Sequence, residues 1–519
     1  MAVVNTGQIP ELKDTFSMRS SHSLDAVAVT FDDERLVADA GLIQPATLAQ
    51  HLGLRGLYDD HVDLGDAPGH ANVGHKAMTV IHSCLAGGDS IDDCDALRAG
   101  ATQAVLGHAV LAPSTLGTFL RSFTWGHARQ LDKVSGIALA RAWAGGAGPG
   151  DAPVTIDIDS SIHETYGLQK QGGKRFTYTH VRGYHPLYAV IAGTGDVVHS
   201  RLRGGNANTA RGAASFLAET FNRVRAAGAT GPLTLRADSG FYARNVVDAC
   251  RKAGVRFSIT AKMNPAIRKA IAAIPADAWT PIPYFLDGAD VAETTYRPFG
   301  KQAPLLRLIV RRVRPTPGSQ LALFVDYTHH ALISDRDGDT LALEADHRRH
   351  AVVEDAIRDL IYGVGLNHLP SGRFGANAAW LALNVTAHNL ARWTSRIGLG
   401  ETIIATDTLR RRHLRLPGRI TTSARKLTLH LPKRWPGQTV QHLTHQPASP
   451  PAPALNTPAP NGTPTHPGDT VDHDAQPKRL NPRGTPQPPQ TARPPSRPPN
   501  PHPHRHKPTP TINRYESVD

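Results

Sequence analysis

The stretch Pro232–Tyr242 reads P-L-T-L-R-A-D-S-G-F-Y, and the rest of the chain is best interpreted outward from it. Apolar Leu233 and Leu235 alternate with polar residues, which predicts a short strand. The strand leads into Asp238, after which a Ser-Gly pair allows a sharp turn, and residues 243–254 follow with helical spacing. An acidic residue is thus expected at the carboxyl end of a strand, the edge where open α/β sheets bind ligands. An aspartate that only caps the next helix is the simpler alternative.

A second acidic strand is predicted directly after a glycine-rich break at residues 144–150. Residues 154–161 read V-T-I-D-I-D-S-S, in which apolar and polar residues alternate. Because alternate residues of a strand point to the same side, Asp157 and Asp159 share one face. Two carboxylates on a central strand are unfavourable unless a cation or hydrogen bonds compensate for them. The pair therefore predicts either a bound cation or compensating hydrogen bonds at this strand; a strand that ends in a capped turn remains the alternative for Asp159.

The order of the predicted elements indicates an α/β fold. Strands are expected over 183–192 and 197–202, a helix over 207–227, then the Asp238 strand with its helix, and a further strand over 255–260. The succession β-β-β-α-β-α-β is typical of ribonuclease-H-like mixed sheets. Between residues 281 and 337 the pattern becomes β-rich, with strands expected over 305–313 and 321–327, and we interpret this segment as an insertion.

The two ends of the chain differ from this central part. The first 145 residues are predicted to be mainly helical, with a helix–turn–helix-like pattern over 41–54 and a helix over 112–123 that Ser114 could cap. Helices resume near Asp346 and again over 374–397. We expect these regions: 1–145, a helical DNA-binding region; 151–280, the first part of the core; 281–340, the insertion; 341–445, the second part of the core with a basic segment; and 446–519, a disordered proline-rich tail.

Charge is unevenly distributed along the chain. The net charge is +13, yet the first 100 residues hold 15 Asp/Glu against 6 Lys/Arg. The densest cationic run, Leu409–Arg419, lies late in the chain, and such a run suits a polyanion. Three cysteines without C-x-x-C spacing argue against a disulfide framework. The sequence offers no run of 18 apolar residues and no export signal at its start, so we expect a cytoplasmic, nucleoid-associated protein.

Three acids are candidates for one shared site: Asp159, Asp238 and Glu354, the last on the predicted helix after residue 346. Two carboxylates about 4 Å apart repel by roughly 4 kcal/mol at an effective dielectric of 20, so gathering three requires a counter-charge. Ligands that are all oxygens favour Mg²⁺ or Mn²⁺. Two such ions support in-line phosphoryl displacement without a nucleophilic side chain. For Glu354 the alternative is an exposed residue paired with Arg358.

These motifs resemble those of the DDE-class transposases of bacterial insertion sequences. The similarity runs from about Leu85 to Leu431 and includes D-x-D-x-[ST] at residues 157–161 and R-A-D-S-G-F at residues 236–241, with G-G-D-S-I-D-D-C-D-A-L-R, G-Y-H-P-L and L-R-G-G-N elsewhere. The resemblance implies a ribonuclease-H-like catalytic domain with a β-strand insertion before the last acid. It also implies Mg²⁺- or Mn²⁺-dependent excision and insertion of element DNA, with two ions per site.

Carried over by position, the resemblance makes Asp159, Asp238 and Glu354 both catalytic residues and metal ligands, with Asp157 as the second choice for the first acid. Three positions depart from the family pattern: His347 replaces an aromatic residue, His350 an arginine and Ile361 a lysine.

We expect terminal inverted repeats and target DNA as partners and a homodimer on DNA. The residues predicted to contact DNA are Arg410, Arg411, Arg412, Arg415, His350 and Arg358. A DNA-binding relative without catalysis and a nuclease that only hydrolyses are the alternatives.

Overall fold

The structure is a computed structural model. It describes residues 30–435 apart from 68, 167–168, 176–179, 284–287, 316–317, 319, 321–325, 368 and 401–404. The predicted disordered tail, 446–519, lies outside the described residues, as does most of the strand expected over 321–327.

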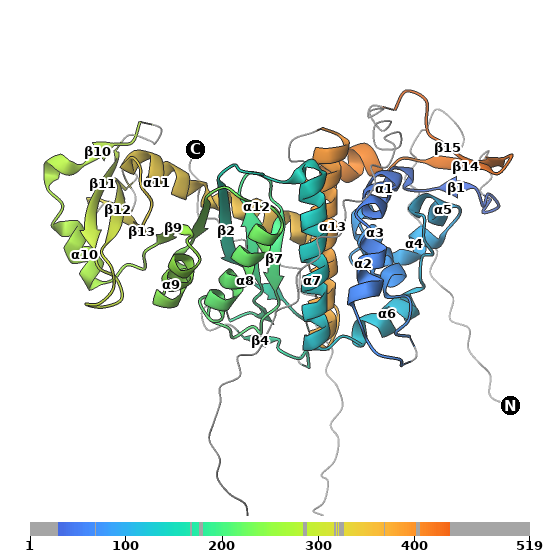
Figure 1. Cartoon of the computed structure of the whole chain (residues 1–519), viewed down its shortest axis with the longest axis horizontal. Helices are drawn as coiled ribbons and strands as arrows, with labels where there is room; N and C mark the ends of the chain where they lie inside the picture. Colours follow the sequence, from blue (N-terminus) through green and yellow to red (C-terminus); the bar gives the residue numbers. More distant parts are fainter. Residues whose placement is uncertain are drawn as a thin grey trace, which may run out of the picture. The chain divides into compact units, whose positions relative to one another are not determined.

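A large mixed sheet forms the centre of the fold, as the sequence predicts (Figure 1). Five of its strands run in the spatial order β7-β6-β2-β8-β9: Val197–Arg201, Leu187–Ile191, Val154–Ser160, Leu233–Ala237 and Arg256–Thr260. β2 is parallel to β8 and β8 to β9, whereas β6 is antiparallel to both β2 and β7. This is the strand arrangement of a ribonuclease-H-like fold. Helices α8 (Ala213–Ala226) and α9 (Arg244–Lys252) pack together and against β7 and β9 respectively.

The insertion extends the same sheet. Its strands β10 (Thr280–Pro281), β11 (Ala289–Tyr296), β12 (Leu306–Val313) and β13 (Thr328–Ser334) follow one another antiparallel, and β13 pairs with β9. Among the described residues the sheet therefore reaches nine strands. Helix α10 (Pro265–Ala272) begins the insertion with Asn264 as its N-cap and packs on β11.

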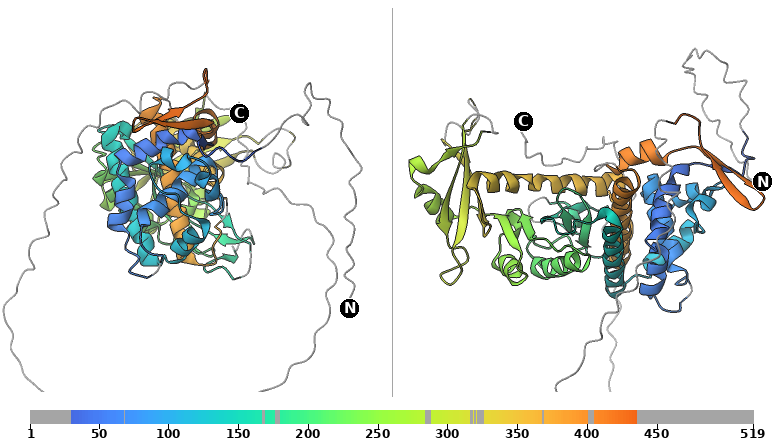
Figure 2. Two further views of the ribbon diagram at one scale, coloured as in Figure 1. Left: turned by 90° about the vertical axis from the view of Figure 1, so that its right-hand side faces the viewer. Right: turned by 45° about the horizontal axis from the view of Figure 1, so that its top comes forward.

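After the insertion the chain forms a helical run that crosses the sheet. It comprises α11 (Thr340–Arg348), a 3-10 turn (Arg349–Ala351), α12 (Val352–Arg358) and a π-helical turn (Asp359–Gly363). α11 contacts β11 and β12, α12 contacts β2 and β6, and the π turn contacts α13. Figure 2 shows this run in its right-hand view as a continuous helix from the insertion strands to α13. The helix therefore connects the insertion with the centre of the fold.

The N-terminal region is helical, as predicted. Its helices are α1 (Ile43–His51), α2 (Leu54–His61), α3 (Val73–Ala86), α4 (Cys94–Arg98), α5 (Thr102–Leu106), α6 (Pro113–Arg121) and α7 (Trp125–Ala142). The long helix α13 (Phe374–Trp393) packs against α3, α6 and α7, and Figure 1 shows it alongside α7. One hydrophobic cluster runs from Leu42 through the sheet to Leu414. These helices thus share a core with the sheet.

Two small sheets complete the described chain. β3 (His163–Glu164), β5 (Arg182–Tyr184) and β4 (Lys174–Arg175) form one of them. The other consists of β1 (Leu36–Val37), near the start of the described chain, and of β14 (Gly418–Ser423) and β15 (Lys426–His430). The last two strands follow the short helix α14 (Thr406–Leu409).

Some sequence predictions differ from the structure in detail. The strand expected over 183–192 is divided into β5 and β6, because Pro186 between them lacks the N–H that a continuous ladder needs. Helix α8 begins at Ala213, not near residue 207, because Gly212 before it has φ 73°, outside the helical region. Ser114 does not cap α6: the N-cap is Ala112, and Pro113 occupies the first turn.

Candidate active site

The first two acids stand at the carboxyl ends of neighbouring parallel strands. Asp159 is the penultimate residue of β2, and Asp238 follows directly after β8. The strand register pairs Ile158 with Ala237, so each acid comes one residue after a paired position. Glu354 is exposed in the first turn of α12, the helix that packs on β2.

A tight turn fixes the direction of Asp238. Its side chain caps the 3-10 turn Ser239–Phe241, accepting a hydrogen bond from the backbone N–H of Gly240 at 3.1 Å. A Cβ on Gly240 would lie only 2.8 Å from the Thr209 methyl carbon, so the turn needs glycine because of close approach. Asp238 is therefore a cap, as the simpler interpretation expected, but of this turn and not of α9.

Electrostatics links the three acids. Burial, together with the carboxylates of Asp238 and Glu354, raises the pKa of Asp159 to about 7, although a hydrogen bond from the Ser160 N–H opposes the shift. The pKa of Asp238 is also raised by burial, with His350 opposing the shift. The three carboxyl groups do not, however, place their oxygens all within 4.8 Å of one another.

The other acid of β2 has a partner of its own. Asp157 is buried and accepts two hydrogen bonds from Arg236 of β8, Nε to Oδ1 at 2.7 Å and Nη2 to Oδ2 at 2.8 Å. The same guanidinium donates to the Asp346 carbonyl at 2.6 Å, and Asp346 also binds Arg336 and Arg349. Burial raises the pKa of Asp157, and the bond from Arg236 opposes the shift. This network joins β2 and β8 to the helix that leads to Glu354.

Sequence reasoning assigned no role to Arg236 or to this network. The sequence feature that could have indicated it is a charged residue, Arg236, on a strand whose alternating apolar residues predict burial. A buried guanidinium needs hydrogen-bond acceptors or a carboxylate partner, and the neighbouring strand offers Asp157 at the same level.

The three departures from the family pattern have distinct environments. His350 places Nε2 3.2 Å from the Ile158 carbonyl, on the strand that carries Asp159. His347 lies between two hydroxyls of β9, Ser258 at 2.7 Å and Thr260 at 2.9 Å, and burial lowers its pKa to about 3. Ile361 packs against the main hydrophobic cluster. His347 is therefore a neutral packing residue, and His350 is the one of the three beside the acids.

A buried histidine holds the segment that follows Asp159 in place. His163 has its Nε2 2.8 Å from both Ser161 Oγ and Tyr188 Oη, and its Nδ1 3.1 Å from the Leu366 carbonyl. Burial lowers the pKa of His163 to about 4, so the ring is neutral at pH 7. Nδ1 then donates to the Leu366 carbonyl, and the single lone pair of Nε2 accepts from one of the two hydroxyls. The hydroxyl two residues after Asp159 thus has a structural partner.

The helix that carries Glu354 is anchored at its far end. Asp359 opens the π turn and accepts hydrogen bonds from the Thr406 N–H and hydroxyl, both at 2.8 Å, with His388 Nδ1 at 3.1 Å. Burial raises the pKa of Asp359, but His388, Arg392 and Thr406 outweigh it and lower it to about 2. Local π turns occur often near functional sites, and this one holds α12 against α13 and α14.

The residues predicted to contact DNA separate into two groups. Arg410 is buried: Nε donates to the Leu85 carbonyl at 2.8 Å and Nη2 to the carbonyls of Cys84 and Gly363. This arginine joins elements of the fold, which corrects its predicted place on a DNA surface. Arg411, Arg412, Arg415 and Arg358 are exposed. Arg358 pairs with Asp355 at 2.7 Å, so the alternative in which it pairs with Glu354 is not what the structure has.

A second cluster of potential metal ligands lies elsewhere. Asp132, His199 and Glu219 have ligand atoms within 4.8 Å of one another. Glu219, however, accepts from Arg129 and Arg201, both at 2.7 Å, and His199 stacks on Phe216 with ring centroids 4.1 Å apart. Cations of the chain already neutralise these acids, so the cluster is a structural ion-pair network.

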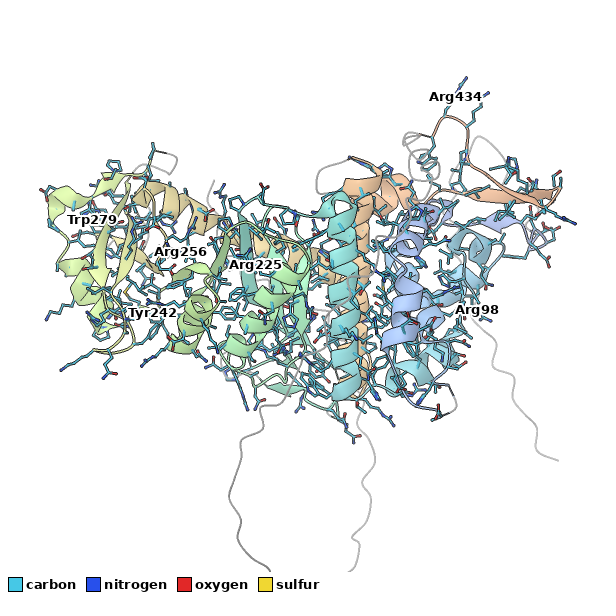
Figure 3. All side chains as sticks on the ribbon, in the orientation of Figure 1. Arg98, Arg225, Tyr242, Arg256, Trp279 and Arg434 are labelled. Carbon is cyan, nitrogen blue, oxygen red and sulfur yellow. The ribbon has the colours of Figure 1, made fainter. Side chains whose placement is uncertain are left out.

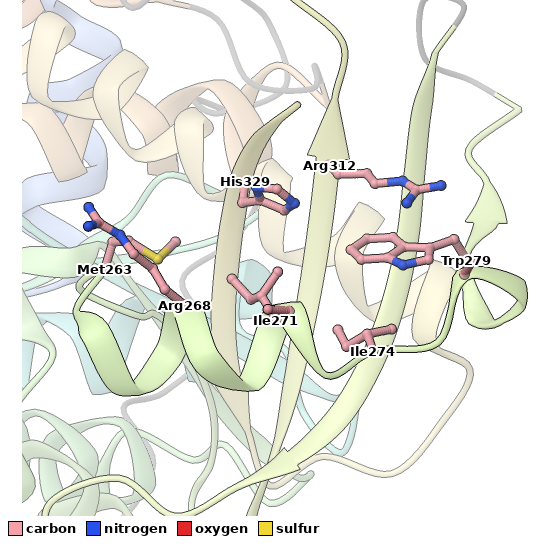
Figure 4. Close-up of a pocket in the computed structure, with 9 residues that line it drawn as sticks. Met263, Arg268, Ile271, Ile274, Trp279, Arg312 and His329 are labelled. Atoms are coloured by element: carbon pink, nitrogen blue, oxygen red, sulfur yellow. The ribbon is translucent and has the colours of Figure 1, made fainter. Parts of the chain in front are cut away.

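The insertion carries a cavity of about 580 Å³ between α10 and the neighbouring strands (Figure 4). Trp279, Arg268, Arg312 and His329 line it with apolar side chains. The Arg312 guanidinium lies 4.2 Å from the Trp279 ring centroid, 4.5 Å from that of Tyr327, and pairs with Asp290 at 2.8 Å. Asp159, Asp238 and Glu354 are not among the residues that line it.

Comparison with known proteins gives the family of the chain. No curated protein matches it. The solved structure of a piggyBac transposase in a synaptic complex with hairpin DNA is similar at 12% identity, covering 72% of this chain and 79% of the other, with a TM-score of 0.42. None of the described helices has the length and apolar character required to span a bilayer. Residues 20–448 match the model of the transposase DDE domain group 1, and the chain therefore belongs to this family of DDE transposases.

Proposed function

We propose that this DDE transposase binds the terminal inverted repeats of an insertion sequence and catalyses metal-dependent DNA strand cleavage and strand transfer. The observation that carries the proposal is the position of Asp159 and Asp238 at the ends of adjacent parallel strands, with the pKa of Asp159 raised by burial and by the carboxylates of Asp238 and Glu354. Acids arranged without a neighbouring arginine favour an external cation.

The three carboxyl groups fit a pair of hard divalent cations, because all their ligand atoms are oxygens and the charged groups that shift the pKa of Asp159 are all acids. Asp159, Asp238 and Glu354 would hold Mg²⁺ or Mn²⁺. When bound, the ions activate the attacking oxygen and stabilise the leaving oxygen of a phosphodiester.

The surrounding residues position the acids. Arg236 holds β2, β8 and Asp346 together, and Asp359 fixes the far end of the helix that carries Glu354. His350 has its Nε2 3.2 Å from the Ile158 carbonyl and opposes the rise in the pKa of Asp238, so it would lie near a phosphate bound at the site. The chain itself thus orders the site, and no nucleophilic side chain is required.

Exposed cations after α14 supply part of the DNA surface in this proposal. Arg411, Arg412 and Arg415 are exposed, with Arg411 paired to Asp407 at 3.1 Å. Excision requires two element ends in one complex, so we expect a homodimer on DNA. Light scattering of the chain with duplexes of the element's end should give two chains and two duplexes per complex.

A matched pair of variants on α12 tests the catalytic assignment. Glu354 and Asp355 are adjacent, exposed acids, and Asp355 pairs with Arg358. Glu354→Gln should abolish Mg²⁺-dependent nicking of a duplex that contains the terminal repeat, whereas Asp355→Asn should retain it. Equal loss in both, or nicking by Asp238→Ala at the wild-type rate, would falsify the assignment.

The two alternative functions predict different products. A nuclease that only hydrolyses cuts the terminal-repeat duplex but does not join a supplied pre-cut 3′ end to target DNA. A DNA-binding relative without catalysis shifts the duplex in salt-sensitive binding and cuts it in neither Mg²⁺ nor Mn²⁺. The transposase proposal requires both cutting and joined product.

A further inference from the structure

The hairpin formed by β14 and β15 lies outside the nine-stranded sheet and takes no part in the site of the three acids. Its cross-strand pairs run from Arg419 with His430 to Ser423 with Lys426. The short strand β1 pairs with β14 on the other side, and β15 is an edge of this three-stranded sheet (Figure 1). An exposed edge hairpin of this kind requires an explanation.

The hairpin has one apolar and one polar face. Ile420 and its cross-strand neighbour Leu429 belong to a small hydrophobic cluster with Val37, Leu416 and Trp435. Strand residues alternate between faces, so the positions between these apolar residues share the opposite face. That face consists of Arg419, Thr421, Ser423, Lys426, Thr428 and His430. Every one of these side chains can donate a hydrogen bond, and two carry a fixed positive charge.

The segment that contains the hairpin carries side-chain charge of one sign. Residues 410–435 hold nine Arg/Lys and no Asp/Glu. Arg425, Lys426, Lys433 and Arg434 are exposed. Figure 3 shows the Arg434 side chain directed away from the ribbon beyond β15. Asp33 pairs with Arg419 at 3.3 Å, so an acid from elsewhere reaches the base of the hairpin. The surface is therefore complementary to a polyanion.

The hairpin turn is strained at the residue that carries its terminal charge. Ala424 has φ 48° and Arg425 has φ 65°, both in the left-handed region. A two-residue hairpin turn requires this geometry, and Asn-Gly meets it without strain. The chain instead places an alanine and an arginine there. Strained backbone at an exposed charged position points to a function for that charge.

We propose that the β14–β15 hairpin docks into the major groove of double-stranded DNA, with its polar face toward the base edges and Arg425 and Lys426 at the phosphates. The major groove, about 12 Å wide, admits a two-stranded ribbon. Arginine and lysine bind phosphates, and hydroxyls, histidine and arginine suit base edges. This inference rests on the proposed function only in taking duplex DNA as the substrate.

The test uses the full chain, a duplex of the element's end, and EDTA so that no cleavage occurs. Arg425→Gly removes the charge and fits the strained turn, so the hairpin is retained; we expect about fivefold weaker binding and a salt slope smaller by about 0.9. Ala424→Asn eases the turn but keeps the charge, and should leave binding unchanged. Lys426→Gln should resemble Arg425→Gly, whereas Lys252→Gln, an equal charge loss on α9, should have a smaller effect.

The hairpin proposal is overturned if Arg425→Gly and Lys426→Gln bind the duplex with wild-type affinity and salt slope while the wild-type chain binds and cuts DNA. A wild-type chain that neither binds nor cuts the duplex overturns the proposed function instead. If the variants change the oligomeric state without DNA but not the affinity for DNA, the hairpin is an interface between copies of this chain, and the proposal is wrong.

Discussion

Two aspartates on β2, two residues apart, have opposite surroundings. Asp157 receives two hydrogen bonds from Arg236, which also binds Asp346. Asp159 has a backbone N–H as its hydrogen-bond partner, and the acids Asp238 and Glu354 act on it. Asp157 thus has a cationic side chain of the protein as its partner, whereas the groups that act on Asp159 are a backbone N–H and other acids. The difference separates an acid that holds the fold together from one that is available to an external cation.

The largest expected effect is on catalysis. Asp159→Asn should reduce Mg²⁺-dependent cleavage of the terminal-repeat duplex at least about 1000-fold, since losing a ligand removes several kcal/mol of transition-state stabilisation. Asp157→Asn should reduce it far less, because Asp157 is bound to Arg236. Single-turnover gel assays measure both rates. If Asp157→Asn slowed cleavage more than Asp159→Asn, Asp157 would be the metal ligand and Asp159 the structural acid.

The next effect is on folding. Arg236→Met leaves Asp157 buried without its cation and should lower the free energy of unfolding by about 3–5 kcal/mol. Adding Asp157→Asn to this variant should recover part of the loss, because the uncompensated charge is then gone. Urea unfolding of the two single variants and the double variant measures the coupling. Additive losses would mean that the pair does not act as a unit.

A third effect, no larger than the second, concerns the pH dependence of stability in the absence of metal. The folded pKa of Asp159, about 7, lies above the unfolded value of 3.8, so the folded chain binds the extra proton between them. Stability should therefore fall as pH rises from about 4 to about 7, by up to about 1.4 kcal/mol per unit. Asp159→Asn should remove this dependence, and its advantage over wild type should grow with pH. A stability difference between the two chains that does not change with pH would contradict the raised pKa.

The smallest effect is expected at the other acidic cluster. Glu219→Gln weakens partly exposed ion pairs with Arg129 and Arg201, so the free energy of unfolding should change by only about 1 kcal/mol. The increase in melting temperature on adding Mn²⁺ should remain as in wild type. A lost Mn²⁺ response would show that Asp132, His199 and Glu219 hold a metal after all.

Much of the core was predictable because its strands have either alternating or continuous apolar residues in the sequence. The strands expected over 154–161 and 255–260 appear as Val154–Ser160 and Arg256–Thr260. The strand Thr328–Ser334 was missed, since it opens on Thr-His-His and carries its apolar residues only afterwards. The joining of the insertion to the edge of the core sheet could not be read from the chain, because strand pairing between β13 and β9 is a long-range contact.

The strand-end positions of Asp159 and Asp238 were predictable from the sequence, but the residues that support them were not. Asp159 and Asp238 stand in motifs at strand ends, where a local pattern is informative. The network of Arg236 joins residues about 110 positions apart, and the burial of Arg410 depends on carbonyls of a distant helix. A run of arginines looks uniform in sequence, and only packing decides which of them are buried.

Mn²⁺ binding measured by electron paramagnetic resonance, with the full chain on an uncut terminal-repeat duplex, tests the central claim most directly. We predict that wild type and Asp157→Asn bind Mn²⁺ alike, whereas Asp159→Asn loses at least one ion. Full Mn²⁺ binding by Asp159→Asn, with loss in Asp157→Asn, would contradict the account.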